Sequence, residues 1–136
     1  MQPRINLITL GVSDLRRATD FYQALGLPRF EFPGEGITFF DLQGTWLALY
    51  PREALAEDIG MPLYGPGAIT LAHNLASPEQ VDRVMEEALA AGATLLKAPQ
   101  ETFWGGYSGY FADPDGFYWE LAHVPQFWIG PGEDEQ

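Results

Sequence analysis

The sequence predicts an α+β fold composed of two tandem βαβββ modules within one domain. Three observations predict it: short β-branched and aliphatic runs, two segments with apolar residues at helical spacing, and the same order of elements after a Pro- and Gly-rich break at residues 61–67. The length of 136 residues suits one domain with a real core. We expect this domain at residues 1–125, with module one at about 4–60, module two at about 67–124, and a C-terminal tail at 126–136.

Module one begins with an aliphatic, β-branched strand at residues 5–12. Ser13 and Asp14 are residues that start helices, and the helix that follows ends at Gly26. Its predicted apolar face consists of Leu15, Ala18, Phe21, Tyr22 and Leu25. Three short strands and a short charged helix complete the module, at residues 29–32, 36–42, 45–50 and 51–58.

Module two repeats this order and begins with a strand at residues 68–75. Ser77 precedes Pro78, which favours the first position of a helix, and Gly92 ends that helix. The apolar face of this helix consists of Val81, Val84, Met85, Ala88 and Leu89. Three further strands are predicted at residues 94–97, 107–112 and 117–123.

A tight turn, Asp113-Pro114-Asp115-Gly116, joins the last two predicted strands. Pro114 restricts φ at the second turn position, and Gly116 supplies the positive φ needed to re-enter a strand. Glu120 follows within an aromatic and aliphatic run, where a carboxylate must face water, a ligand or a partner. Three interpretations of Glu120 remain open: a pocket carboxylate paired with a Tyr, Trp or Lys side chain, a general base whose pKa is raised by burial, or a metal ligand.

Composition excludes several classes of protein. The formal net charge is −12, from 19 acidic and 7 basic side chains, which argues against nucleic acid and anionic membranes as partners. The sequence contains no cysteine, which excludes disulfides, thiolate nucleophiles and cysteine-ligated metals. We find no signal peptide and no apolar run of transmembrane length, so we expect a cytoplasmic protein.

Several short motifs occur in a defined order along residues 5–123: Leu10-Gly11-Val12-Ser13-Asp14-Leu15, Phe21-Tyr22, Leu25-Gly26, Ala91-Gly92-Ala93, Phe111-Ala112-Asp113-Pro114-Asp115-Gly116 and Glu120-Leu121. In this order and spacing the chain resembles the vicinal oxygen chelate superfamily, the group of glyoxalases, bleomycin-resistance proteins and extradiol dioxygenases. The resemblance implies that the modules form a curved sheet around a cavity, and that the chain forms a homodimer. It also implies one divalent metal, with one ligand from the first strand and one from the last strand of each module.

When the modules are aligned on their last hairpins and helix starts, the four implied ligand positions are Leu7, Ala48, Thr70 and Glu120. Only Glu120 is a good metal ligand, Thr70 would be a weak neutral donor, and the other two cannot ligate. Because divalent metal sites need three or four N or O ligands, we expect no bound cofactor. If a divalent metal binds, the alternative ligand set is Glu120 with His73 and His123, which requires a different strand register.

Strand alternation distinguishes the polar residues of the strand at 68–75. His73 has the opposite parity to Thr70, so we expect it on the helix side of its sheet, although a one-residue bulge would turn it towards the cavity. Asn74 shares the parity of Thr70 and is expected to line the pocket. His123 lies at the end of the last strand, where it is either exposed or at the cavity mouth.

Aromatic residues surround the glycines of residues 103–110, and two interpretations are open. They pack in the core beside a Gly-rich hairpin, or they form a loop that lines a pocket for a flat or apolar ligand. Trp46 and Tyr118 correspond between the modules and are core residues or pocket walls. The predicted ligand-binding residues are therefore Thr70, Asn74, Trp104, Tyr107, Tyr110, Tyr118 and Trp46.

The favoured function is metal-independent binding of a small molecule, because only one of the four ligand positions implied by the resemblance is kept. One alternative is a metal-dependent lyase, isomerase or dioxygenase of the same superfamily. Another is a metal-free enzyme in which Glu120 removes a proton from an acidic C–H beside a carbonyl. The expected partners are a small-molecule ligand and a second copy of the chain, with no nucleic acid and no membrane.

Overall fold

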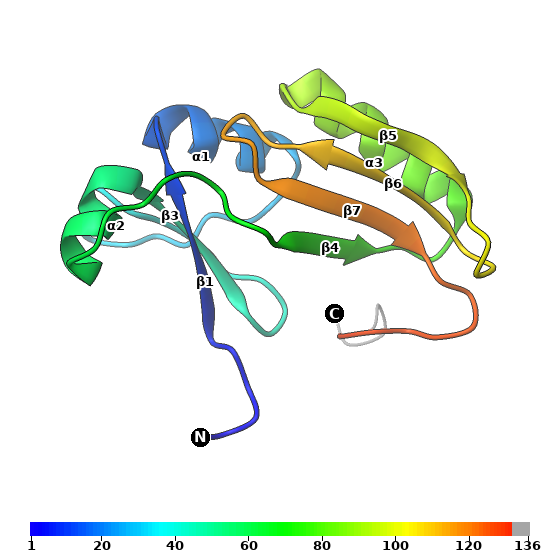
Figure 1. Cartoon of the computed structure of the whole chain (residues 1–136), viewed down its shortest axis with the longest axis horizontal. Coiled ribbons are helices and arrows are strands. Elements are labelled where there is room, and N and C mark those ends of the chain that lie inside the picture. Colours follow the sequence, from blue (N-terminus) through cyan, green and yellow to red (C-terminus); the bar gives the residue numbers. More distant parts are fainter. Residues whose placement is uncertain (132–136) are drawn as a thin grey trace. The chain divides into compact units, whose positions relative to one another are not determined.

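The computed structural model describes residues 1–131 and divides into two compact units, Met1–Gly67 and Ala68–Gln136. The boundary between the units falls at the Pro- and Gly-rich break that separates the predicted modules. Part of the predicted tail, residues 132–136, lies outside the described residues. Each unit has its own sheet, with three strands in the first and four in the second, so the α+β prediction is confirmed with two sheets in place of one (Figure 1).

The first unit contains a mixed sheet in the order β1-β3-β2 and two helices. Strand β1 pairs parallel with β3, and β2 pairs antiparallel with β3. Its elements are β1 (Leu7–Val12), α1 (Leu15–Ala24), β2 (Thr38–Phe40), β3 (Trp46–Pro51) and α2 (Arg52–Ile59). The core side chains that are almost fully buried are Leu10, Val12, Phe21, Tyr22, Phe40, Leu47 and Leu49.

Local sequence explains the ends of α1. The Asp14 side chain accepts a hydrogen bond from the Arg17 backbone N–H at 3.0 Å, which satisfies one of the free donors of the first turn. Gly26, with φ of 97°, follows the last turn. The apolar positions expected for this helix place Phe21 and Tyr22 in the core, where their rings meet edge to face.

The predicted strand at residues 29–32 is wrong. In the structure only Arg29 forms an isolated bridge, with Phe40, while the Phe30 backbone N–H donates to the Phe39 carbonyl at 2.8 Å. Pairing ends there because the chain continues into Pro33, which has no N–H to donate, and Gly34. The first unit therefore contains one strand fewer than a full βαβββ module.

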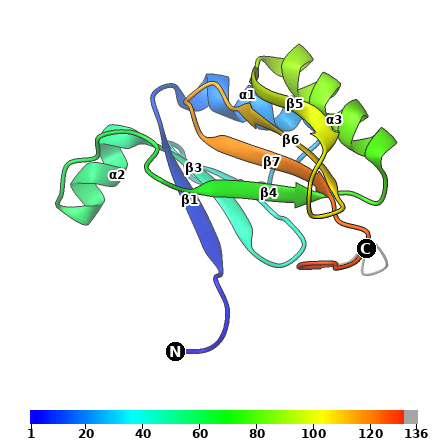
Figure 2. The ribbon, with the colours of Figure 1, turned by 45° about the vertical axis from the view of Figure 1, so that its right-hand side comes forward.

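The second unit is a complete βαβββ module with the strand order β4-β7-β6-β5. Its elements are β4 (Thr70–Asn74), α3 (Pro78–Ala91), β5 (Thr94–Glu101), β6 (Tyr107–Ala112) and β7 (Tyr118–His123). Helix α3 packs along one face of this sheet against β5, β6 and β7, which leaves the opposite face without a helix from this unit (Figures 1 and 2).

Capping and turn residues act as the sequence predicts in this unit. The Ser77 side chain accepts from the Gln80 backbone N–H at 3.2 Å, Pro78 begins α3, and Gly92 ends it with φ of 118°. In the turn between β6 and β7, Asp113 is 3% exposed and its Oδ1 accepts from the backbone N–H groups of Asp115 and Phe117 at 2.9 and 2.8 Å.

The two parallel strand pairs have the same register. Leu7 lies opposite Trp46 in the first unit, as Thr70 lies opposite Tyr118 in the second. The alignment that equates Ala48 with Glu120 therefore agrees with the backbone pairing.

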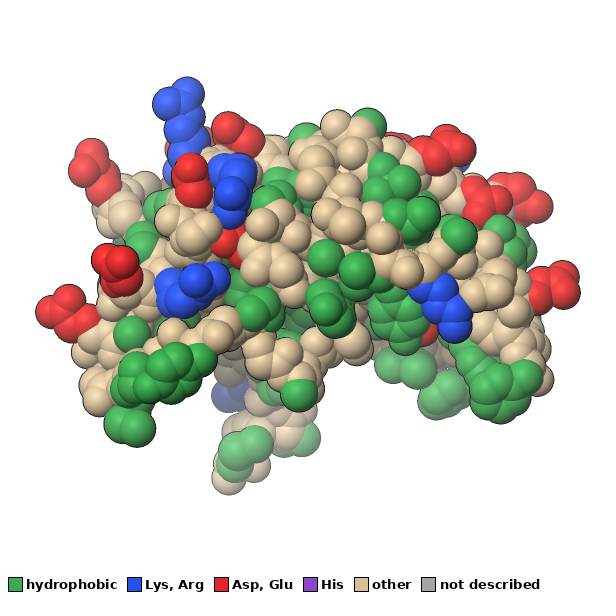
Figure 3. Space-filling view, turned by 45° about the horizontal axis from the view of Figure 1, so that its top comes forward, with side chains coloured by type: hydrophobic (Ala, Val, Ile, Leu, Met, Phe, Trp, Pro, Cys, Tyr) green, Lys and Arg blue, Asp and Glu red, His purple; other side chains and the backbone are tan. Residues whose placement is uncertain are grey.

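The helices and the charged surface of the described residues have one general property each. None of the helices in residues 1–131 combines the length and the apolar character that a membrane-crossing helix requires. On the face drawn in Figure 3, Lys and Arg side chains are interspersed with Asp and Glu side chains.

Candidate functional site

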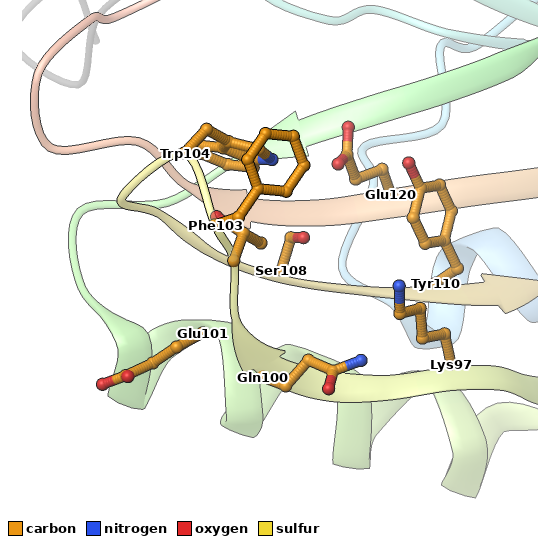
Figure 4. Close-up of a pocket in the computed structure, with 9 residues that line it drawn as sticks. Lys97, Gln100, Glu101, Phe103, Trp104, Ser108, Tyr110 and Glu120 are labelled. Atoms are coloured by element: carbon orange, nitrogen blue, oxygen red, sulfur yellow. The ribbon is translucent and has the colours of Figure 1, made fainter.

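A cavity of about 320 Å³ lies in the second unit, on the face of the sheet away from α3. Tyr107 marks the helix side, because its hydroxyl donates to Asp82 of α3, and side chains alternate along β6. Ser108 and Tyr110 therefore point to the opposite side, where they line the cavity. The lining residues come from β5, β6, β7 and the connection between β5 and β6 (Figure 4): Lys97, Gln100, Glu101, Thr102, Phe103, Trp104, Ser108, Tyr110 and Glu120.

Tyr110 and Glu120 form the polar pair at one side of the cavity. They lie opposite each other on β6 and β7, and both side chains line the cavity (Figure 4). Burial raises the pKa of Tyr110, and the negative charge and the hydrogen bond of Glu120 raise it further. Near neutral pH the phenol of Tyr110 is therefore protonated.

Lys97 is brought to the cavity by an irregular strand. Its amine points into the cavity from β5 (Figure 4), and the pairing of β5 with β6 shifts register on both sides of Lys97. Such irregularities re-aim side chains relative to a regular strand. Gly109 permits this path, because a Cβ atom there would lie 2.8 Å from both the Lys97 carbonyl oxygen and the Pro99 nitrogen.

The aromatic rim of the cavity, defined as Phe103 and Trp104, belongs to the tight connection at residues 102–106. The Thr102 N–H donates to the Gly106 carbonyl, and the Gly106 N–H donates to the Thr102 hydroxyl, both at 3.0 Å. The Gln126 side chain donates to the Trp104 carbonyl at 2.9 Å. Phe103 is fully exposed and Trp104 is 38% exposed, so two ring surfaces remain available beside the cavity.

The other predicted ligand-binding residues of the second unit lie elsewhere. Thr70 is exposed on β4, and the Asn74 amide donates to the Ile129 carbonyl at 3.4 Å. Tyr118 is half exposed at the start of β7 and does not line this cavity. Tyr107, which the sequence groups with the pocket aromatics, does not line this cavity, and its hydroxyl donates to Asp82 of α3.

Trp46 lies in the first unit, within a cluster of aromatic rings. Its ring centroid is 4.9 Å from that of Phe30 and 6.5 Å from that of Phe39. Phe32 packs in turn on Phe39, with centroids 5.1 Å apart. Trp46 is therefore a member of a partly exposed aromatic face in its own unit.

The histidines do not join Glu120. His73 lies opposite Leu121 in the pairing of β4 with β7, and His123 is three residues beyond Glu120, so both have the opposite parity. The His123 ring nitrogen Nδ1 lies 3.0 Å from the Leu75 carbonyl oxygen. Within residues 1–131 no three His, Cys, Asp or Glu side chains are placed to hold a metal ion. The donors of the described residues therefore do not fit a divalent metal site.

Sequence reasoning missed five lining residues: Lys97, Gln100, Glu101, Thr102 and Ser108. For Lys97 one observation was available, since it is the only lysine in the chain. The other four have ordinary polar or acidic side chains, and their positions depend on how β5 and its connection pair with β6.

Comparisons with known proteins agree with this architecture. The family model described as Glyoxalase/Bleomycin resistance protein/Dioxygenase superfamily matches residues 4–121. Two similar relatives are both called metallothiol transferase FosB. The protein from Shouchella clausii is 33% identical over 120 residues, which cover 86% of this chain and 77% of the relative. The protein from Lysinibacillus sphaericus is 27% identical over 117 residues, covering 86% and 79%.

Solved structures are similar over almost the whole chain. A glyoxalase-related enzyme from Fulvimarina pelagi is 37% identical, with a TM-score of 0.87 and coverage of 94% of this chain and 93% of that chain. A glyoxalase/bleomycin resistance protein/dioxygenase from Nocardioides is 26% identical, with a TM-score of 0.77 and coverage of 97% and 91%.

Proposed function

The chain belongs to the Glyoxalase/Bleomycin resistance protein/Dioxygenase superfamily, and we propose that within it this protein is a metal-independent binder of a small organic molecule. The ligand occupies the cavity of the second unit. It contacts the Tyr110–Glu120 pair and Lys97 through polar groups, and the aromatic rim of Phe103 and Trp104 through a flat apolar part.

The chemical composition of the cavity carries this proposal. It combines a small number of polar side chains with two exposed rings in about 320 Å³, at the lower end of the roughly 300–1,000 Å³ typical of small-molecule sites. Aromatic rings give large contact area and stack on planar ligands. A hydroxyl, a carboxylate and an ammonium group orient the ligand rather than supply most of its binding energy.

The side chains available as metal ligands favour binding of the small molecule without a metal. Glu120 is the one good ligand among the four positions at which the modules correspond, because Leu7 and Ala48 are apolar and Thr70 is neutral. The carboxylate lies opposite Tyr110 on the neighbouring strand. A divalent ion would need at least two more good donors.

A second candidate is metal-dependent chemistry of the same superfamily. It is favoured by the similarity to two relatives that are named metallothiol transferases. Because the donors described above do not fit a divalent ion, we derive no reaction step for it.

Two measurements separate the candidates. Protein purified without affinity-tag metal is analysed for metal content, and its melting temperature is measured with and without Mn²⁺, Fe²⁺, Ni²⁺ and Zn²⁺. We expect metal far below one ion per chain and no rise in melting temperature. Near-stoichiometric metal, or a clear rise in melting temperature with one ion, would overturn metal-independent binding.

Ligand binding is tested by screening small aromatic compounds by ligand-observed NMR. Trp104→Ala removes part of the rim, and Tyr64→Ala is the matched control, because Tyr64 is 93% exposed and lies in the first unit. Compounds that bind the wild-type protein should bind Trp104→Ala more weakly and Tyr64→Ala equally well. Binding that is indifferent to Trp104 would place the ligand elsewhere.

A further inference from the structure

Lys97 is the only lysine among 136 residues, and it lines the cavity. The chain has a net charge of −12, so a positive group at this concave site is unlike the average surface. Lys97 is also the only basic residue among those that line the cavity. The net charge of the whole chain therefore does not describe the cavity, whose charge depends on the side chains that line it.

The two carboxylates near Lys97 are not placed as its partners. Glu120 lies opposite Tyr110 on the neighbouring strand, and the side chain of Glu101 points away from the other lining residues (Figure 4). Within residues 1–131 the Lys97 ammonium takes part in no ion pair or side-chain hydrogen bond. Its three donors remain available to a ligand.

The backbone is arranged so that this amine faces the cavity. Register shifts occur between Leu95 and Lys97 and between Lys97 and Gln100, so the strand is irregular on both sides of the lysine. Gly109 allows this irregular strand to approach β6 closely. The rings of Phe103 and Trp104 lie in the same cavity, within reach of one small ligand.

We propose that Lys97 makes the site selective for organic anions, with an acidic group bound by the ammonium and an aromatic body on the rim of Phe103 and Trp104. This inference rests on the proposed function, since it specifies the ligand class of the same cavity. Charge-assisted hydrogen bonds are stronger than neutral ones, and they strengthen where ligand and walls exclude water. The ligand class is therefore an aromatic carboxylate or a similar planar acid.

The experiment compares three probes that share one ring system: 2-naphthoate, 2-naphthamide and 2-naphthylmethylamine, which are anionic, neutral and cationic at pH 7. Reductive methylation with ¹³C-formaldehyde retains the charge of amines and labels two sites, Lys97 and the N-terminal amine. We expect 2-naphthoate to shift the Lys97 signal and to leave the N-terminal signal unchanged. Its dissociation constant should be about ten-fold lower than that of the amide.

Lys97→Met and Arg83→Met change the net charge equally, and Lys97→Arg leaves it unchanged. Lys97→Met should abolish the preference for the carboxylate and leave amide binding within about two-fold, and Lys97→Arg should retain most of the preference. Arg83→Met is the control, because Arg83 lies on α3 and does not line the cavity. Circular dichroism confirms that each variant is folded.

The outcomes separate this inference from the proposed function. Equal binding of the three probes, or a preference for the anion that survives in Lys97→Met, overturns the anion inference but leaves binding at the cavity intact. Failure of all three probes to bind overturns the anion inference, and the screen with Trp104→Ala then decides the proposed function separately. Preferential binding of the cationic probe overturns the inference in favour of recognition by Glu120.

Discussion

Tyr110 and Glu120 lie directly opposite each other on β6 and β7, and both side chains line the cavity. The pair determines which protons are present in the site at neutral pH. Because the phenol stays protonated, it is a hydrogen-bond donor. The carboxylate keeps acceptor capacity for a ligand.

The first prediction concerns this pair. Burial, the charge of Glu120 and the hydrogen bond all raise the pKa of Tyr110 above 10.0, so Glu120→Gln should lower that pKa while burial keeps part of the shift. Absorbance at 295 nm during an alkaline titration follows tyrosine ionisation, and Tyr110→Phe identifies the contribution of Tyr110. An unchanged titration in Glu120→Gln would contradict the pairing.

The second prediction concerns stability at alkaline pH. A hydrogen bond to Asp82, then burial, raises the pKa of Tyr107, so the folded state holds this proton more tightly than the unfolded chain. Its stabilisation is complete below the unfolded pKa of about 10 and is lost as pH rises through the higher folded pKa. Urea unfolding between pH 8 and 11 should show a smaller alkaline loss of unfolding free energy in Tyr107→Phe than in the wild type. Equal losses in the two proteins would argue against the Asp82 contact.

The third prediction concerns Gly106, because a Cβ atom there would overlap the indole of Trp104. Gly106→Ala should displace the ring and cost about 1–3 kcal/mol of unfolding free energy, as overpacking does elsewhere. In a Trp104→Ala background the overlap is absent, so the same change should cost less than about 0.5 kcal/mol. Urea unfolding of the four proteins completes a double-mutant cycle. A cost that is equal in both backgrounds would mean that the indole does not lie over Gly106.

The fourth prediction concerns Gly109, where the backbones of the paired strands β5 and β6 approach closely. A methyl group there meets backbone atoms of Lys97 and Pro99, which cannot rotate away, so Gly109→Ala should lose about 1–3 kcal/mol. Gly11→Ala is the matched control, because its nearest neighbour at 3.3 Å is the flexible end of Leu55. It should lose clearly less stability. Equal melting temperatures of the two variants would contradict a close approach of the β5 backbone to Gly109.

The fifth prediction concerns the turn between β6 and β7. Asp113→Ala removes the acceptor for two backbone N–H groups and should cost about 1–3 kcal/mol, whereas Asp113→Asn keeps an acceptor oxygen and should cost less. Thermal unfolding monitored by circular dichroism ranks the variants. A smaller loss for Ala than for Asn would show that these hydrogen bonds contribute little.

Local sequence predicted those parts of the fold that depend on neighbouring residues. The caps at Asp14 and Ser77, the end of α3 at Gly92 and the turn at Asp113 all involve residues within five positions of each other. The prediction of a strand at residues 29–32 was wrong. Its apolar residues are typical of a strand, but Pro33 interrupts pairing after a single bridge.

The candidate site was only partly predictable. Glu120, Trp104 and Tyr110 were identified as candidates and line one cavity. Alternation along β6 already separates Tyr107 from Tyr110, but the sequence does not say which of the two faces α3. The packing of α3 decides which side chains of β6 face the helix, through contacts such as the one between Asp82 and Tyr107.

The sequence by itself determined the order of the elements apart from the strand at residues 29–32, the repeat of two modules, the family and the lack of metal-ligating side chains at three of four corresponding positions. Those properties follow from residue types and short spacings. Only the tertiary structure decided that Lys97, from an irregular edge strand, shares a cavity with Tyr110 and Glu120. The physical reason is that the register shifts of β5 and the close backbone approach at Gly109 depend on pairing between strands, and no short sequence pattern encodes that pairing.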